Sequence, residues 1–118
     1  MPTAAVPEIN VRDFAEKLHS PDRFYVLDVR ETWETNLARV NDERMVFLPM
    51  SQIGRERKAA FPAALLDPQT EWVVMCHHGV RSADVTMWMK QQGWQNVRSL
   101  RGGIAAYAGE IDPSVGIY

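Results

Sequence analysis

Cys76 is the only cysteine of the 118-residue chain, and its surroundings could present a reactive thiol. It follows the apolar run Trp72–Met75, and the short glycine-containing loop His77–Gly79 leads toward a segment of helical character that begins near Ser82. A short apolar run of this kind is typical of a buried strand. A strand, a thiol, a tight loop and a helix in this order predict a nucleophilic cysteine at the edge of a parallel sheet.

The loop offers several groups that would stabilise a thiolate. The helix start directs unpaired N–H groups and the positive end of its dipole toward the sulfur, and Gly79 lets the backbone turn so that other N–H groups converge there. Arg81 adds a positive charge at the junction, or reaches outward to an anionic substrate. We therefore expect the Cys76 sulfur to be anionic and exposed at neutral pH. The same groups would stabilise a persulfide, so sulfur transfer needs only this one cysteine.

The cysteine and the two histidines of the loop each allow more than one role. A lone cysteine is often an inert buried residue, but the position of Cys76 before a loop and a helix favours the reactive role. His77 and His78 are adjacent on a tight loop, so we expect their rings to point apart. A structural zinc site needs four ligands, and we predict no metal and no cofactor. We interpret the two histidines as loop lining that shapes access, with proton transfer by one of them as the less favoured alternative.

Length and composition indicate one ordinary globular domain that spans residues 1–118. Hydrophobic residues make up 46% and charged residues 24% of the chain. A net charge of -2 gives no support for nucleic acid or an anionic membrane as a partner. Residues 1–7 lack the basic segment and apolar core of a signal peptide, and no apolar run approaches the roughly 20 residues of a membrane span. We expect a cytoplasmic protein whose thiol is free.

The rest of the chain alternates helical and extended patterns. Asn10 predicts a cap for a helix with apolar residues at 11, 14, 15 and 18. Strands are expected at 24–29, 45–48, 72–75 and 96–100. Helical segments are expected at 30–37, 50–66, from near 82 to about 92, and at 104–107. Gly54 and Pro62 should interrupt the second of these segments, and Gly93 should terminate the third. Gly102-Gly103 indicates a tight backbone approach, and residues 110–118 show no clear period. This alternation predicts an α/β domain with a mostly parallel sheet.

Three blocks of the sequence together resemble the single-domain rhodanese family. They are VLDVRETWE at 26–34, CHHGVRS at 76–82 and LRGGIAAY at 100–107, in the family's order and spacing. The resemblance implies a rhodanese fold, with a five-stranded parallel sheet and helices on both faces. It also implies that Cys76 accepts a sulfane sulfur from thiosulfate or a persulfide and passes it to cyanide, a thiol or a protein. The implied substrate-binding loop is His77, His78, Gly79, Val80, Arg81 and Ser82.

Other positions of the resemblance carry less chemistry. Asp28, Arg30 and Glu31 match the family's second-strand signature, and we interpret them as support that fixes the turn after the strand. The family usually has a histidine and then a glycine before its third strand, whereas residues 37–44 contain neither, so the conformation of that connection stays open. The form of the cysteine loop and the IDPSV ending are similar to rhodanese domains beside ubiquitin-like activating enzymes, which implies a possible protein partner.

Sulfur transfer by double displacement through Cys76 is the leading hypothesis. One alternative is a phosphatase or arsenate reductase of related fold, whose loop is one residue longer. Because only four residues separate Cys76 from Arg81, a phosphate-sized substrate would be crowded. The other alternative is a module without enzymatic activity, either a sulfur carrier or a docking domain.

Overall fold

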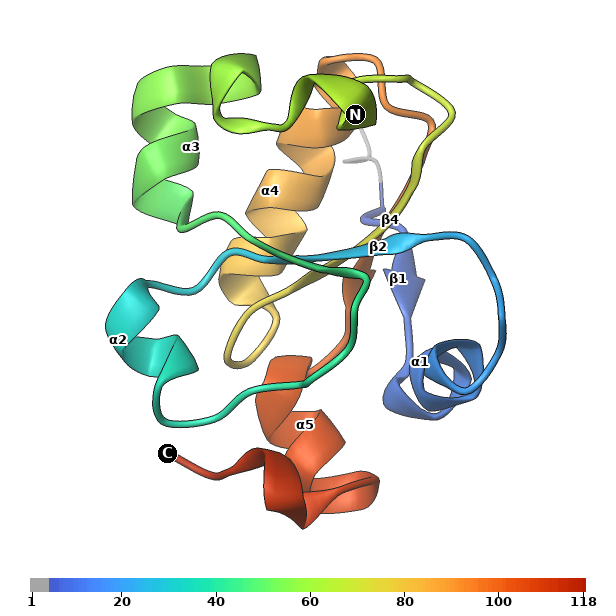
Figure 1. Cartoon of the computed structure of the whole chain (residues 1–118), viewed down its shortest axis with the longest axis vertical. Coiled ribbons are helices and arrows are strands. Elements are labelled where there is room, and N and C mark those ends of the chain that lie inside the picture. Colours follow the sequence, from blue (N-terminus) through green and yellow to red (C-terminus); the bar gives the residue numbers. More distant parts are fainter. Residues whose placement is uncertain (1–4) are drawn as a thin grey trace.

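The strand that precedes Cys76, β4 (Glu71–Met75), lies in the middle of the sheet. The computed structural model describes residues 5–118, with five strands in the order β1-β5-β4-β2-β3 and every pairing parallel (Figure 1). The other strands are β1 (Glu8–Ile9), β2 (Tyr25–Asp28), β3 (Met45–Phe47) and β5 (Asn96–Leu100). The predicted α/β fold with a five-stranded parallel sheet is confirmed. Residues 1–4, part of the stretch that lacks the features of a signal peptide, lie outside the described residues.

Helices cover both faces of this sheet. Their bounds are α1 (Val11–Leu18), α2 (Thr32–Thr35), α3 (Met50–Glu56), α4 (Val80–Gln91) and α5 (Gly103–Glu110), with short 3-10 turns at Arg57–Ala60, Ala63–Leu65 and Pro113–Val115. Helices α1 and α5 bury their apolar residues in a core on one face, and α3 and α4 do so on the other. Among the described residues, no helix has the length and apolar character needed to cross a bilayer.

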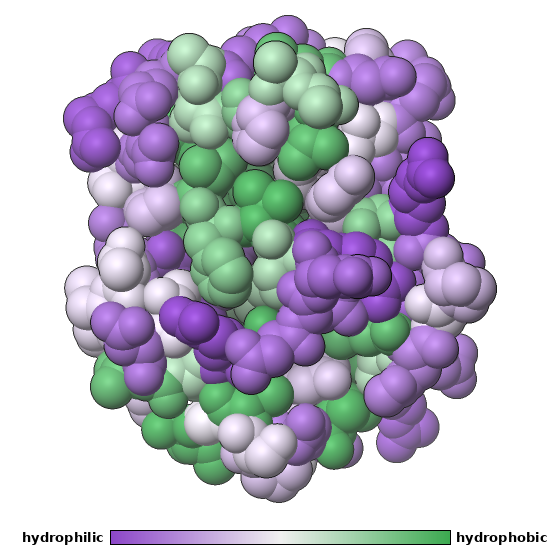
Figure 2. All heavy atoms as spheres, in the orientation of Figure 1, coloured by the Kyte–Doolittle hydropathy of each residue, from purple (hydrophilic) through white to green (hydrophobic). Residues whose placement is uncertain are grey.

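Strands β2 and β4 are buried on both sides, which explains their almost uninterrupted apolar sequences. Val26 and Val73 belong to the core under α1 and α5, whereas Leu27 and Val74 belong to the core under α3 and α4. Aromatic rings centred on Phe61 extend this second core, and Figure 2 shows hydrophobic residues gathered over α3 and α4 on the same face. Two packed layers on a central sheet hold the end of β4 rigidly.

Several local predictions are confirmed and several are corrected. The Asn10 side chain accepts the Asp13 N–H at 2.8 Å and caps α1, and Gly93 has a left-handed φ of 109° after α4. Helix α4 begins at Val80, two residues before the predicted start. The break predicted at Gly54 is wrong, because α3 continues through it and ends before Arg57, which has a φ of 56°. Strand β1 was not predicted, because two residues carry no period.

The connection that departs from the family pattern is held by three separate segments. Arg30 donates to the Ala38 carbonyl at 2.8 Å, and the Arg39 N–H donates to the Val115 carbonyl at 2.8 Å. Arg44 donates to the Leu18 carbonyl at 2.6 Å and thereby satisfies the end of α1. Backbone carbonyls and two arginine side chains, Arg30 and Arg44, therefore order the segment without the family's histidine and glycine.

Candidate active site

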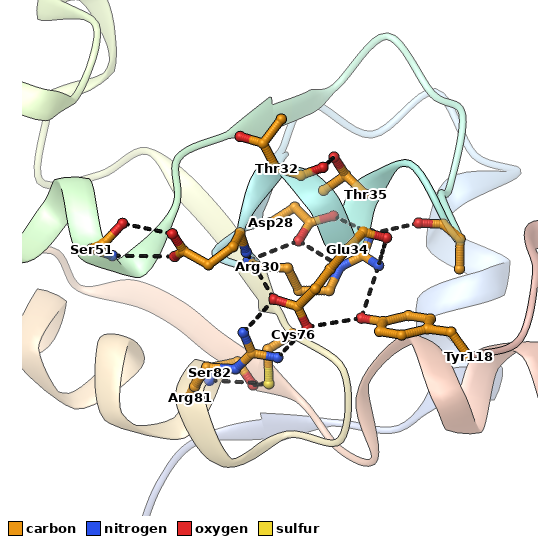
Figure 3. Close-up of polar contacts among 12 residues, drawn as sticks. Asp28, Arg30, Thr32, Glu34, Thr35, Ser51, Cys76, Arg81, Ser82 and Tyr118 are labelled. Atoms are coloured by element: carbon orange, nitrogen blue, oxygen red, sulfur yellow. Dashed lines mark hydrogen bonds and ion pairs between the residues drawn. The ribbon is translucent and has the colours of Figure 1, made fainter.

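Cys76 immediately follows β4 at the carboxyl end of the sheet, and its side chain meets the start of α4 (Figure 3). Its Sγ accepts the Gly79 N–H at 3.0 Å and the Ser82 N–H at 3.3 Å. Ser82 is the third residue of α4, so its N–H has no partner within the helix. The sulfur therefore takes the place of a helix-capping acceptor, where a negative charge is stabilised.

The sulfur is not exposed, contrary to the prediction. Cys76 has only 1% of its surface accessible, and it belongs to the apolar core under α3 and α4. The loop turns back over the thiol because its own N–H groups reach the sulfur. A cavity of about 220 Å³ lies beside the loop at His77, between α5 and the tail, but Cys76 does not line it. A reactant can reach the sulfur only when side chains or backbone at the loop move.

The start of α5 holds the outer side of the loop. The Ile104 N–H donates to the Cys76 carbonyl at 2.9 Å, and the Ala105 N–H donates to the His77 carbonyl at 3.0 Å. Gly103 makes this approach possible, since a Cβ there would lie 2.5 Å from the Cys76 carbonyl oxygen. The predicted backbone approach at Gly102-Gly103 is confirmed, and its partner is the cysteine loop. With their carbonyls bound by α5, Cys76 and His77 direct no carbonyl oxygen toward the sulfur.

Arg81 makes no hydrogen bond to the sulfur, and it forms a two-pronged ion pair with Glu34 of α2 while a third of its side chain stays exposed. Its Nη1 and Nη2 donate to the Glu34 carboxylate at 2.7 and 2.8 Å (Figure 3). Hydrogen bonds from Arg81 lower the pKa of Glu34 to about 2, against the opposing effect of burial. The guanidinium charge is therefore balanced at the loop by Glu34, and a role of Arg81 toward an anionic substrate stays a prediction.

The C-terminal tail also enters the site. The Tyr118 hydroxyl donates to Glu34 at 3.1 Å and accepts from Arg30 at 3.1 Å, and its ring stacks on His77 with centroids 3.8 Å apart. The rings of His77 and His78 lie 3.9 Å apart, so the expectation that they point apart is wrong. Burial, and then the neighbouring His78, lower the pKa of His77, which favours the neutral form of this ring.

The residues predicted as support lie behind this site. Asp28 and Arg30 are both fully buried and form an ion pair of 2.8 Å at the end of β2. Glu31 accepts from the Ser51 hydroxyl at 2.7 Å and so joins α2 to α3. Val80, predicted as part of the substrate-binding loop, is 73% exposed and makes none of the hydrogen bonds to the sulfur. Within residues 5–118, no cluster of three or more histidine, cysteine or acidic side chains could hold a metal ion.

Sequence reasoning did not single out Glu34, Tyr118 or Ser99 as members of the site, and the Ser99 hydroxyl oxygen lies 2.8 Å from that of Ser82. Glu34 stands three residues after Glu31, the spacing of a capping box, and its carboxylate does accept the Glu31 N–H at 2.9 Å. This signal could have placed Glu34 at the start of α2, but not beside Arg81. No local pattern places Tyr118 or Ser99 near residue 76, because both contacts join distant parts of the chain.

The Glu34 ion pair should make stability depend on pH in acid. The folded pKa of about 2 lies below the ordinary value of 4.5, so the contribution of Glu34 is complete above pH 4.5 and is lost as pH falls toward 2. We expect Glu34→Gln to be less stable than the parent at pH 6, with a difference that shrinks toward pH 3. Urea unfolding of both proteins at several pH values measures this difference in stability. A difference that does not change with pH would contradict the lowered pKa of Glu34.

The fold and the loop define a class of protein: an α/β domain that presents one thiol from the end of its middle strand to a helix start. The chain belongs to the rhodanese family, because the family model described as "Rhodanese-like domain" matches residues 10–110. The loop that forms the site is also the block that carries the resemblance in the sequence.

Relatives with curated descriptions and solved structures agree with this assignment. The chain is 29% identical to "Putative sulfurtransferase YtwF" of Bacillus subtilis, over 92% of this chain and 96% of that protein. It is also 32% identical to "Rhodanese-like/PpiC domain-containing protein 12, chloroplastic" of Arabidopsis thaliana. That match covers 96% of this chain but only 38% of the relative. A rhodanese-related protein from Thermoplasma volcanium superposes with a TM-score of 0.71 at 28% identity, over 89% of this chain and 93% of that one.

Proposed function

We propose that the protein is a sulfurtransferase that carries a sulfane sulfur as a Cys76 persulfide. The donor is thiosulfate or a persulfide, and the acceptor is cyanide, a thiol or a protein. The observation that carries the proposal is the pair of N–H groups, from Gly79 and Ser82, that meet at the Sγ of the only thiol. Family membership and the similarity to "Putative sulfurtransferase YtwF" support the same conclusion.

The reaction has two displacements that balance without an external oxidant. The Cys76 thiolate attacks the outer sulfur of the donor, a new S–S bond forms, and sulfite or a thiolate leaves with the electrons of the broken S–S bond. The acceptor then attacks the terminal sulfur, and the Cys76 thiolate leaves. The Gly79 and Ser82 N–H groups stabilise the thiolate at the beginning and end of this cycle.

The surface around the site would suit a protein donor or acceptor. Trp33, Val80 and Ile117 are 63%, 73% and 78% exposed, and each is the chain neighbour of Glu34, Arg81 or Tyr118. Because Arg81 and Tyr118 each donate a hydrogen bond to Glu34, the exposed apolar side chains come from segments that meet at the site. Exposed apolar residues that gather in this way favour protein contacts.

Intact-protein mass spectrometry tests the proposal. After treatment with thiosulfate or glutathione persulfide, we expect a species heavier by one sulfur atom, and cyanide should remove it with release of thiocyanate. Cys76→Ser is the matched control and should show no added sulfur. A Cys76 protein that gains no sulfur from either donor would sink the proposal.

A sulfur carrier that is loaded by one protein is the second candidate. The 1% exposure of Cys76 favours it, since small donors then have little access. The chain is also 28% identical to "Putative sulfur carrier protein YrkF" of Bacillus subtilis, although it spans only 55% of that protein. Saturable turnover of a small donor with cyanide would favour the enzyme, whereas loading by a protein persulfide alone would favour the carrier.

A further inference from the structure

We infer that Ser99 of β5 is a positioning residue that orients the Ser82 hydroxyl toward the Cys76 sulfur. The two serine Oγ atoms lie 2.8 Å apart, and the Ser82 Oγ lies 3.4 Å from the Cys76 Sγ. The three side chains are 0 to 1% exposed, so solvent cannot replace any of these contacts. The role in sulfur transfer rests on the proposed function, whereas the effect on the thiolate does not.

Ser99 breaks the pattern of its strand. Side chains two residues apart share a face of a strand, so Ser99 points to the same side as Val97, which packs in the apolar core under α3 and α4. Its register partner on β4 is Val74, a member of the same core. A hydroxyl buried among such residues is costly without a hydrogen bond, and the partner of this hydroxyl is Ser82.

The direction of the two hydroxyl bonds depends on the state of the sulfur. A thiol donates to the Ser82 Oγ, and Ser82 then donates to Ser99. A thiolate can only accept, so Ser82 must donate to the sulfur and must accept its second bond from Ser99. Both hydroxyl hydrogens rotate, and no proton passes along the pair. Ser99 therefore supplies a donor to Ser82 in the state in which Ser82 supports the negative charge.

Loss of Ser99 would release the Ser82 side chain. A serine in the first turns of a helix can rotate and donate to a carbonyl of the preceding turn, which competes with other partners. The sulfur would then keep its two backbone N–H donors and lose its hydroxyl donor. The thiolate should become less favourable while the fold is retained, since alanine fits the space of serine.

The experiment compares the thiolate in Ser99→Ala, Ser82→Ala and the double variant. We expect Ser99→Ala to lower the rate of Cys76 alkylation by iodoacetamide at neutral pH about three- to tenfold, the loss typical of one hydrogen bond. The ultraviolet absorbance of the thiolate should develop at higher pH in the variant. If Ser99 acts only through Ser82, adding Ser99→Ala to Ser82→Ala should have no further effect. Ser99→Thr, which keeps a hydroxyl, should restore the parent profile.

Thr86→Val is the matched control. Thr86 lies on α4 one turn after Ser82, is fully buried, and its hydroxyl has no hydrogen-bond partner among the described residues. This variant should leave the pH profile of alkylation unchanged. An unchanged pH profile of alkylation in Ser99→Ala would overturn the inference. A double variant whose loss of alkylation rate combines the full losses of both single variants would overturn it as well. Persulfide formation is read separately by mass, so failure of sulfur transfer would leave this result intact.

Discussion

Gly103→Ala is expected to lower sulfur transfer by about 100-fold, because it moves the cysteine loop by roughly an ångström. Gly103 has a φ of 62°, and an added Cβ would lie 2.4 Å from the His77 carbonyl oxygen and 2.5 Å from the Cys76 carbonyl oxygen. These are backbone atoms, which cannot rotate out of the way. Strain at the left-handed residue and overpacking should together cost about 2 to 4 kcal/mol in the free energy of unfolding.

Gly109→Ala provides a control in the same helix. A Cβ at Gly109 meets no atom within 4 Å, and its φ is not positive. Alanine should therefore stabilise α5 by about 0.5 to 1 kcal/mol and leave transfer unchanged. Urea unfolding and the rate of thiocyanate release measure both effects. Gly103→Ala with parental activity would mean that α5 does not hold the loop in place.

Asp28→Ala should cause the largest loss of stability, about 3 to 5 kcal/mol, because it leaves a buried arginine without its counter-ion. Arg30 and Asp28 are both completely buried, and two guanidinium nitrogens donate to the carboxylate at 3.0 and 2.8 Å. The same guanidinium donates to the Ala38 carbonyl and to Tyr118. Its displacement should therefore loosen the connection after α2 and the tail together.

Glu8→Ala is the matched test of an ion pair at the surface. Arg101 and Glu8 approach to 3.3 Å, but their side chains are 69% and 38% exposed. This change should alter the free energy of unfolding by less than about 1 kcal/mol. Chemical unfolding of both variants compares a buried pair with an exposed one in the same protein. Equal losses would contradict the burial-based argument for Asp28.

The sequence predicted those parts of the site that depend on local pattern. The apolar run before Cys76 marks a buried strand, Gly79 marks the turn and the helix follows it, so the position of the thiol could be predicted. Gly102-Gly103 also indicates a close backbone approach, although the sequence does not indicate which segment approaches. These features follow from periodicity and from the conformational freedom of glycine, which are properties of a few neighbouring residues.

Contacts across the fold could not be predicted in this way. Glu34 and Arg81 are 47 residues apart, and Arg30 and Tyr118 are 88 apart. The tail has no period, so nothing in it indicates that its tyrosine stacks on His77. The burial of Cys76 was also missed, because the same loop that brings N–H groups to the sulfur closes over it.

The environment of the thiol is completed only by residues far downstream of it. Ser99, the N–H groups of Ile104 and Ala105, and the ring of Tyr118 all follow Cys76 by more than 20 residues. A ribosome releases the chain from its N-terminus, so the cysteine leaves the exit tunnel before the groups that enclose it. During that interval the thiol is open to oxidants and metals, and the last strand and helix must form before the loop that encloses it is held in place.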